Sequence, residues 1–580
     1  MGETLAVPST HDERWYRRGS WVVVCLVVLL LVAGALHGQI WFDESYSVAL
    51  ARESLADIWR IGAADVHPVL YYVALHGLYL IFGENLVVYR LFSCAGLVAA
   101  VMLGPTIVRR DFGARVGFWF SLLVGFCPYL LYLAEQVRMY SWTIAAIAYC
   151  LVMTVRVASA GASALRASWA GLVASSYLAA CLHYYGALTA AALMVGVLVV
   201  LVLRRDRLAT RRLLVLSALE LALYLPFALV LVRQAGSVSG GFWISFSLPR
   251  TIFELIWYPL LPESILSWLR TLPTLPRCAV EWGLVALAVA GAFATAWAYV
   301  RYRAAGNTSP TAWRDALANP SREAVYLGVS AYLAVLALGA IASAALGTMV
   351  LYYRYLAIAL VCPALSLAVV LGANPERCAT WGKAHEAPAR PFQIALVTVL
   401  VMCALVTFTH DAMSAYDPAN GHALDTVRDA AEVEGEGEAL PVVSAHITVG
   451  GVLAVSAPDV PQLYLNELLP MWGKAYEVYV PPLKNIEYIA AGASELQDGF
   501  IFVCKPEPEE LAAAADSGDT GASTLGNARV AEGDSDRVVP DQLRKLAELP
   551  GVTVDEVIYV DRPYEGTYYA VARCSYHPGS

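Results

Sequence analysis

Two adjacent carboxylates, Asp43 and Glu44, follow directly on the first long apolar stretch of the chain. The three residues before them, Ile40, Trp41 and Phe42, would hold the pair at a membrane interface. A carboxylate in that place could act as a general base that takes a proton from a hydroxyl or an amine. The simpler alternative is that the pair gives a helix a charged end.

Two arginines in similar surroundings offer the opposite charge. Arg138 lies in the segment 135–140 (EQVRMY), and Arg354 lies in the segment 352–355 (YYRY). A guanidinium group matches a phosphate with two parallel donors, and it can stabilise the charge that develops as a phosphate leaves. Alternatively, Arg138 pairs with Glu135 at i,i+3 spacing, and Arg354 is a snorkelling interface residue.

Two histidines also fall in polar segments near apolar runs. His67 could precede a helix that begins at the following proline, or it could bind a divalent cation together with Asp65 and the carboxylate pair. His183 and the two tyrosines after it are typical of an interfacial belt, or they contact a ligand. The eleven cysteines show no zinc spacing, and the chain has no nucleotide-binding motif. We therefore assign no metal site and no certain cofactor.

Composition indicates which elements must position these residues. The chain has 580 residues, of which 58% are hydrophobic and 15% are charged, as in a polytopic membrane protein. Residues 1–410 carry a net charge of +9, whereas residues 411–580 carry −18. This split predicts a membrane domain and an acidic soluble tail, and the charge of the tail argues against nucleic-acid binding.

Apolar runs and basic loops predict about eleven transmembrane helices, with the N-terminus inside and the C-terminus outside. The first run could be a cleaved signal peptide, but the many later runs favour a retained helix. The apolar stretch within 68–82 is short for a crossing, so we expect it to lie on the outer surface or to dip into it. We expect a second helix along that surface at 252–268. The predicted spans are 21–36, 86–108, 116–133, 141–158, 168–184, 187–203, 213–232, 279–300, 324–346, 356–372 and 392–409.

The tail is predicted to form an α/β domain over residues 439–580, after a linker at 411–438. Cys504 and Cys574 each end a strand-like run, and they could form a disulfide if the tail is exported. A helix is predicted over Pro540–Leu549 and a loop over Asp516–Asn527. The strand-like runs are Pro441–Ala445, Tyr476–Val480, Phe500–Cys504, Val557–Val560 and Tyr568–Cys574.

The order of these motifs resembles the membrane glycosyltransferases with the C-type fold, in the branch of protein O-mannosyltransferases and aminoarabinose-like transferases (family 39-like). The likeness covers residues 20–410. It is carried by the acidic pair, by the segment 67–72 (HPVLYY), by 135–140 and by Arg354-Tyr355. The family's usual His-Pro-Pro is His67-Pro68-Val69 here, and the aminoarabinose branch tends to have lysine where this chain has His67.

The resemblance implies an inverting transfer of a monosaccharide from a polyprenyl-phosphate sugar to an acceptor, on the extracytoplasmic face of the plasma membrane. The acceptor could be a protein, a lipid or a wall polymer. In that family the first carboxylate of the pair is the base. The predicted catalytic residues are Asp43 and its neighbour Glu44, and the predicted substrate-binding residues are His67, Tyr71, Glu135, Arg138, Tyr140, His183, Tyr184, Arg354 and Tyr355.

Two other classes remain open. In a multi-spanning transporter or lipid flippase, the same charges would line a pathway, and polar residues would also occur at mid-span. Glu220 is the main residue of that kind. In a surface-assembly or sensor protein, the tail would carry the function and changes at Asp43 would be tolerated.

Overall fold

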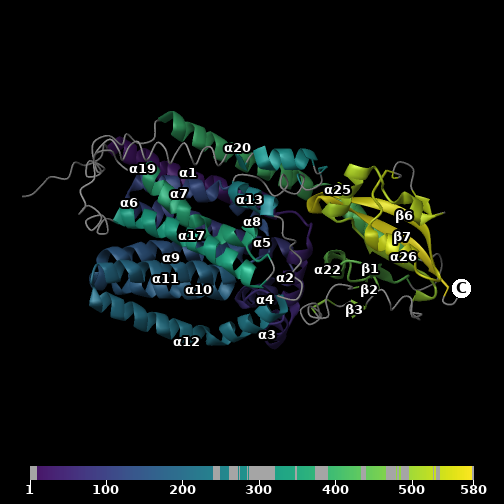
Figure 1. Cartoon of the computed structure of the whole chain (residues 1–580), viewed down its shortest axis with the longest axis horizontal. Helices are drawn as coiled ribbons and strands as arrows, with labels where there is room; N and C mark the ends of the chain where they lie inside the picture. Colours follow the sequence, from purple (N-terminus) through teal and green to yellow (C-terminus); the bar gives the residue numbers. More distant parts are fainter. Residues whose placement is uncertain are drawn as a thin grey trace, which may run out of the picture.

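The chain forms a helical bundle with a smaller sheet domain at one end (Figure 1). The structure is a computed structural model. It describes residues 10–238, 248–259, 269, 272–273, 275–283, 285–286, 320–346, 349–372, 390–432, 439–465, 478–479, 483–484, 496–526, 528–530, 534 and 536–577.

The bundle is built from long apolar helices that lie side by side (Figure 1). Helix α9 lies at its centre and packs against α5, α10, α11 and α17. Glycines permit this closeness, as small residues do between membrane helices: a Cβ on Gly96 of α5 would lie 2.6 Å from the backbone of Ser141 in α9. The helices are α1 (Thr10–Ala35), α5 (Leu86–Met102), α9 (Tyr140–Ala160), α10 (Arg166–Leu182), α11 (Tyr184–Leu203), α12 (Arg207–Val238), α17 (Pro320–Leu346), α19 (Val361–Gly372) and α20 (Arg390–Ala415).

The prediction of a mostly helical polytopic membrane fold with a C-terminal α/β domain is confirmed. Among the described residues, eight helices are long and apolar enough to cross a membrane, or nine if a bent pair counts as one span. The span predicted at 168–184 corresponds to α10, which has 17 residues. The span predicted at 279–300 lies mostly outside the described residues. The count of eleven and the orientation therefore stay predictions.

The bent pair is formed by α7 (Ala114–Gly125) and α8 (Pro128–Glu135), at the span predicted over 116–133. The two helices meet at 61°. Pro128 can begin α8 but cannot continue α7, because proline lacks the backbone donor that a helix interior requires. The bend aims the end of α8 at the turn 136–139, which carries one of the predicted site arginines.

Three short helices lie at the end of the bundle that faces the sheet domain: α2 (Phe42–Arg52), α3 (Leu55–Gly62) and α4 (Leu70–Phe82) (Figure 1). Helix α4 has 13 residues, so it is only about 20 Å long and too short to cross about 30 Å of hydrocarbon. The three helices share an apolar cluster that is separate from the core of the bundle. Of the segment 252–268 predicted to lie along the surface, the structure describes the part in α13 (Leu248–Trp257) and the residues up to 259.

The C-terminal domain contains a seven-stranded mixed sheet in the order β3-β2-β1-β4-β7-β6-β5. Strands β1 to β4 pair in parallel, and β6 and β7 form an antiparallel hairpin beside them. Helices α21 (Ala419–Ala431), α22 (Ile447–Ser456), α25 (Pro508–Ser517) and α26 (Asp541–Ala547) accompany the sheet. The strands are β1 (Val442–Ser444), β2 (Gln462–Leu465), β3 (Leu483–Lys484), β4 (Phe500–Cys504), β5 (Arg529–Val530), β6 (Val552–Arg562) and β7 (Thr567–Tyr576).

Four of the five predicted strand-like runs are strands; the fifth, Tyr476–Val480, lies largely outside the described residues. The segment predicted as a linker contains α21, whose Ala423 and Val427 pack against the sheet. Cys504 and Cys574 are free and buried. They cannot form a disulfide here, because Cys504 faces Ala570 in the sheet register and is therefore four residues along β7 from Cys574.

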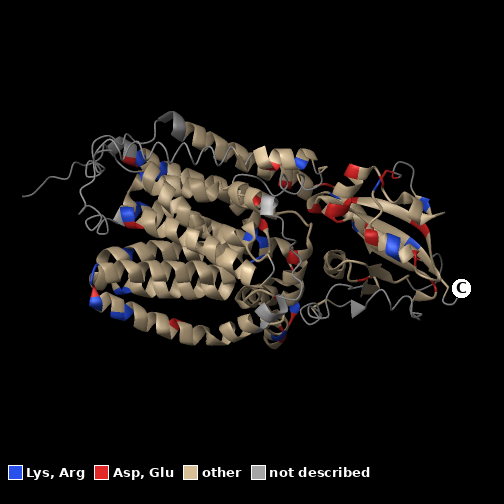
Figure 2. Ribbon diagram, viewed as in Figure 1, with Lys and Arg blue, Asp and Glu red and all other residues tan. Residues whose placement is uncertain are grey.

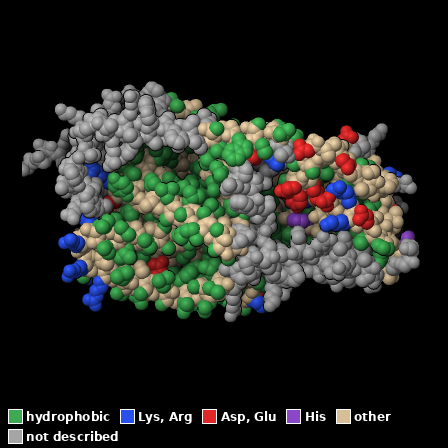
Figure 3. Space-filling view, viewed as in Figure 1, with side chains coloured by type: hydrophobic (Ala, Val, Ile, Leu, Met, Phe, Trp, Pro, Cys, Tyr) green, Lys and Arg blue, Asp and Glu red, His purple; other side chains and the backbone are tan. Residues whose placement is uncertain are grey.

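Charge is distributed unevenly along the molecule. Lys and Arg residues gather at the end of the bundle farthest from the sheet domain, and acidic residues are frequent on that domain (Figure 2). Hydrophobic side chains cover most of the visible bundle surface (Figure 3). The predicted site residues lie at the other end of the bundle, where the bundle meets the sheet domain.

Candidate functional site

Asp43 lies in the first turn of α2, where the helix dipole favours a negative charge. Its Oδ2 atom accepts a hydrogen bond of 3.0 Å from Nη1 of Arg354. The side chain of Asp43 is 22% exposed. The carboxylate is thus held in place by one ion pair and still reachable from outside the protein.

Glu44 faces the opposite way and is completely buried. Its carboxylate accepts two hydrogen bonds from Arg90, one from Nε at 2.9 Å and one from Nη2 at 2.7 Å. The backbone N–H of Val137 donates a third hydrogen bond to it at 3.1 Å. The structure therefore gives Glu44 the surroundings of a residue that holds α2 against α5 and the turn after α8, not those of a group that meets a substrate.

Arg138 reaches across from the turn after α8 to the start of α2. Its Nη1 donates to the backbone carbonyl of Asp43 at 3.3 Å and to the hydroxyl of Tyr72 at 3.3 Å. Its Nε is buried and has no hydrogen-bond partner. Burial opposes its charge, but the neighbouring Tyr72 and Asp43 raise the pKa of Arg138 well above its usual value.

His67 links Arg138 to a second acidic residue. Its Nδ1 lies 3.2 Å from Oδ2 of Asp65, and its Nε2 lies 3.4 Å from Nη2 of Arg138. A neutral ring that donates from Nδ1 to Asp65 would accept from Arg138 at Nε2. Burial raises the pKa of Asp65, but the hydrogen bond from His67 and the charge of Arg138 lower it below its usual value overall.

Arg354 approaches Asp43 from α18 (Tyr353–Leu356). Its guanidinium lies 5.1 Å from the centre of the Trp41 ring and 5.7 Å from that of Tyr352, both within cation–π range. Its Nε is also buried without a hydrogen-bond partner. Arg138 and Arg354 therefore both retain unused donors beside Asp43.

An aromatic group lies next to the arginines. The ring of His183 lies 5.6 Å from that of Tyr140 and 5.4 Å from that of Tyr355. The Nδ1 atom of His183 accepts from the backbone N–H of Tyr185 at 3.0 Å, which leaves Nε2 as the donor. That Nε2 atom is buried and has no hydrogen-bond partner.

Three other predicted site residues have neighbours of their own. The hydroxyl of Tyr71 is hydrogen-bonded to Ser93 inside the protein at 2.6 Å, and the hydroxyl of Tyr184 donates to Gln234. Glu135 lies against α1, where its carboxylate occupies the space that a Cβ on Gly34 would need. No ion pair joins Glu135 to Arg138 among the described residues, so Arg138 remains available to Asp43.

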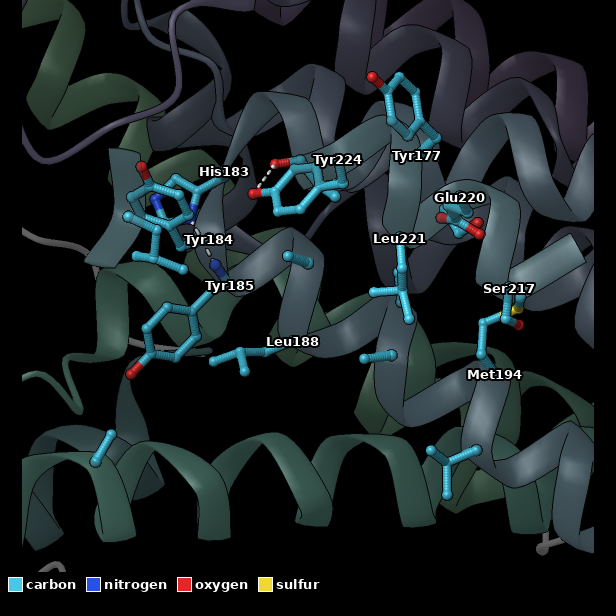
Figure 4. Close-up of a pocket in the computed structure, with 18 of the residues that line it drawn as sticks. Tyr177, His183, Tyr184, Tyr185, Leu188, Met194, Ser217, Glu220, Leu221 and Tyr224 are labelled. Atoms are coloured by element: carbon cyan, nitrogen blue, oxygen red, sulfur yellow. Dashed lines mark hydrogen bonds between the residues drawn. The ribbon is translucent and has the colours of Figure 1, made fainter. Parts of the chain in front are cut away.

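An apolar cavity of about 630 Å³ opens beside this group. It runs between α10, α11, α12 and α17, with His183, Tyr184 and Tyr185 at one end and Met194, Ser217 and Glu220 at the other (Figure 4). His67 and Tyr355 also line it. One end of the cavity is thus lined by His67, which contacts Arg138, and the cavity extends from there into the apolar interior of the bundle.

Sequence reasoning missed Arg90 and His37 at the site. Arg90 lies in a predicted span, and an ionisable residue there is a signal that could have drawn attention to it. Its Nη1 donates to the carbonyl of His37 at 2.7 Å and lies 3.0 Å from Nδ1 of that residue. Burial and the charge of Arg90 lower the pKa of His37 to about 3, which keeps its ring neutral.

The described residues hold no group of three His, Cys, Asp or Glu side chains that could bind a metal ion. Of the carboxylates suggested for a divalent cation, Asp43 is paired with Arg354 and Glu44 with Arg90. These pairs give no observation in favour of a metal, and a divalent cation stays a prediction.

Comparison with known protein families and with curated proteins finds no match. Two solved structures are similar, both of ArnT from Cupriavidus metallidurans, one bound to undecaprenyl phosphate and one in the apo state. The first has 18% sequence identity and a TM-score of 0.40, and the second has 15% and 0.39. Each match covers 86% of this chain and 94% of ArnT. At these values the likeness alone is too weak to argue from, so function must be argued from the site.

Proposed function

We propose that this protein transfers a monosaccharide from a polyprenyl-phosphate donor to an acceptor, with Asp43 as the general base, on the extracytoplasmic face of a plasma membrane. One observation carries the proposal. A partly exposed carboxylate lies beside two arginines with unused donors. His67, which contacts Arg138, and Tyr355, which follows Arg354, line one end of an apolar cavity in a membrane-type bundle. This arrangement suits a substrate that has a phosphate head and an apolar tail.

The cavity provides the tail site. It is lined mainly by Ala, Leu, Val and Met side chains, and its volume is within the range of ligand sites in proteins. The phosphate would lie at the end with His183 and Tyr355, where Nε2 of His183 and the Nε atoms of Arg138 and Arg354 have no partners in the protein. Undecaprenyl phosphate, the compound bound in one ArnT structure, has this chemistry.

The reaction we propose is a single displacement. The acceptor O–H gives its proton to Asp43 as its oxygen bonds to the anomeric carbon. The bond from that carbon to the phosphate oxygen breaks, and the polyprenyl phosphate leaves with an additional negative charge. Arg138 and Arg354 would stabilise that charge. Attack on the face opposite the leaving group inverts the configuration at the anomeric carbon.

The pair between Asp43 and Arg354 suggests an order of events. While Arg354 holds the carboxylate, its hydrogen bond occupies Oδ2 of Asp43. A donor phosphate offers Arg354 a second anion that it can bind through two parallel hydrogen bonds. Donor binding would then release Asp43 for the acceptor and keep the base inactive until the donor is present.

Photocross-linking with a photoreactive undecaprenyl phosphate analogue tests the tail site. We expect labelled peptides from α11, α12 and α17, and competition by unlabelled undecaprenyl phosphate. Labelling confined to the outer lipid-facing side of α12 would contradict the site. A panel of undecaprenyl-phosphate monosaccharides, offered to the purified protein with envelope extract, then tests transfer; no transfer from any donor would contradict the function.

One observation favours a second candidate, a lipid flippase. Glu220 lies inside the apolar part of α12 and lines the far end of the cavity, as a polar residue along a transport pathway would. A flippase would move a fluorescent polyprenyl phosphate across proteoliposome membranes without transferring sugar. A transferase would instead cleave the sugar from polyprenyl phosphate, and it would do so on one side of the membrane only.

A further inference from the structure

The C-terminal domain contacts the segment that carries Asp43, and the first contact is made by α22. Val452 of α22 belongs to the same apolar cluster as Tyr46 and Leu50 of α2. The helices approach closely at Gly451, where a Cβ would lie 2.7 Å from the hydroxyl of Tyr479 and 3.0 Å from the ring of Phe42. Glycine is therefore needed there for α22 to lie on the start of α2.

Tyr479, which is also in the C-terminal domain, adds a polar contact. Its hydroxyl lies 3.1 Å from Oγ of Ser45, two residues after Asp43, in a buried hydrogen bond. Its ring lies 6.4 Å from the rings of both Phe42 and Tyr46. The first turn of α2 thus has C-terminal-domain side chains along one side.

The second contact comes from the turn between β6 and β7. Arg562 is completely buried, and its Nη2 donates to the backbone carbonyl of Ile40 at 3.3 Å. Its Nη1 donates to the carbonyl of Asn420 at 2.9 Å. Tyr564 follows, and its hydroxyl lies 3.5 Å from Oε2 of Glu44.

Tyr564 also packs among the groups that hold Glu44. Arg90 lies 5.8 Å from the centre of its ring, and the ring of His37 lies 4.8 Å away. Burial and the charge of Glu44 raise the pKa of Tyr564 well above its usual value, so its hydroxyl stays a donor. The carboxylate of Glu44 is therefore enclosed by groups from both domains.

The segment before α2 depends on these contacts. Residues 37–41 form no helix or strand. Its carbonyls at His37 and Gln39 accept from Arg90 of the bundle, and its carbonyl at Ile40 accepts from Arg562 of the C-terminal domain. Side chains of two domains donate hydrogen bonds to these carbonyl groups. Loss of the hydrogen bonds from either domain would therefore free the backbone that leads to Asp43.

We infer that the C-terminal domain is part of the catalytic centre of this protein: Arg562, Tyr564 and Tyr479 are positioning residues that fix the start of α2, so that Asp43 stays beside Arg138 and Arg354. The catalytic part of this inference rests on the proposed transferase function. The structural part is that the domain holds residues 37–46 in place, and this part does not rest on the transferase function.

Two variants of the protein test the two contacts one at a time. Tyr564→Phe removes only the hydroxyl next to Glu44, and Tyr568→Phe is its control, since that hydroxyl donates to Val538 within the C-terminal domain. Gly451→Ala adds a Cβ where α22 meets α2. Gly77→Ala is its control, because a Cβ there meets nothing within 4 Å.

Hydrogen exchange followed by mass spectrometry tests the structural part. We expect peptides from residues 37–46 to exchange about tenfold faster in Tyr564→Phe and Gly451→Ala, and at the wild-type rate in both controls. Peptides from α9 should exchange at the same rate in the wild type, the two test variants and the two controls, which excludes general unfolding. Unchanged exchange in 37–46 in both test variants would overturn the inference.

Turnover of the active donor from the undecaprenyl-phosphate monosaccharide panel tests the catalytic part. We expect kcat to fall about 10- to 100-fold in both test variants, with KM for the donor nearly unchanged, because a misplaced base slows chemistry without removing the donor site. Faster exchange with an unchanged kcat would overturn the positioning role. If the wild-type protein transfers no sugar, the proposed function fails, and hydrogen exchange alone decides whether the domain holds the segment.

Discussion

At the residue scale, the two neighbouring carboxylates have different surroundings. Successive residues of a helix point about 100° apart, so Asp43 faces Arg138 and Arg354 while Glu44 faces Arg90 inside the protein. The sequence identified the pair as unusual, and the family resemblance singled out its first member as the base. The sequence could not reveal the burial of Glu44, because Arg90, the partner of Glu44, lies 46 residues away.

Removing the charge of Glu44 should destabilise the protein. Glu44→Gln would leave Arg90 buried without its counter-ion, and breaking a buried pair in this way costs about 3–5 kcal/mol. We expect a clear drop in Tm in detergent. Glu84→Gln, which breaks the partly exposed pair with Arg52, should cost at most about 1 kcal/mol. Equal Tm values for the two variants would show that Glu44 does not have this stabilising role.

At the scale of elements, apolar runs predicted helices well, because spans of about 20 apolar residues are a strong local signal. Strands β2 and β3 were not predicted, because their four and two residues carry too little local pattern. The segment 411–438, which ends in an acidic Gly-Glu repeat, is predicted to be a linker that is helical at best. Only the sheet beside α21 explains the buried alanines of this helix. The cavity is formed by three consecutive helices, α10, α11 and α12, together with the distant helix α17.

Filling the cavity should weaken lipid binding. Leu188 lines it (Figure 4), so Leu188→Trp would occupy space that we assign to the polyprenyl tail. We expect the Kd for undecaprenyl phosphate to rise about tenfold or more, as for the loss of a few buried methylene contacts. Val199→Trp on the exposed side of the same helix is the control. An unchanged Kd in Leu188→Trp would place the tail elsewhere.

At the scale of the molecule, the split in charge predicted two parts, but not that they share the site. A sequence does not show which surfaces of two domains meet, and the contacts of Arg562 with Ile40 and of Tyr479 with Ser45 join residues more than 400 positions apart. The basic end of the bundle lies opposite the sheet domain (Figure 2), which agrees with the predicted topology.

The contribution of His446 to the stability of the C-terminal domain should fall in acid. Burial, followed by the charge of Lys505, lowers the pKa of His446 to about 4 from 6.5. Between these values the unfolded chain binds a proton that the folded domain does not. His446 therefore stabilises the domain fully above about pH 6.5. Up to about 3 kcal/mol of the free energy of unfolding is lost as the pH falls toward 4.

Hydrogen exchange of β4 and β7, corrected for the intrinsic effect of pH, measures this loss at pH 7.5 and pH 5. Glu510 acts in the opposite sense: burial raises its pKa to about 7, so its contribution is present in acid and lost as the pH rises through 7. His446→Gln removes only the first titrating group, so between pH 7.5 and pH 5 the variant should lose less stability than the wild-type domain. The same change in stability between the two pH values in both proteins would contradict the role of His446.

The central claim is that Asp43 is the base of a sugar transfer from a polyprenyl phosphate. The most direct test is the rate of transfer by Asp43→Asn with the donor that the wild-type protein uses, measured beside its Kd for undecaprenyl phosphate. We predict that transfer falls at least about 100-fold, while the variant stays folded and still binds undecaprenyl phosphate. A folded Asp43→Asn protein that transfers sugar at close to the wild-type rate would contradict the account.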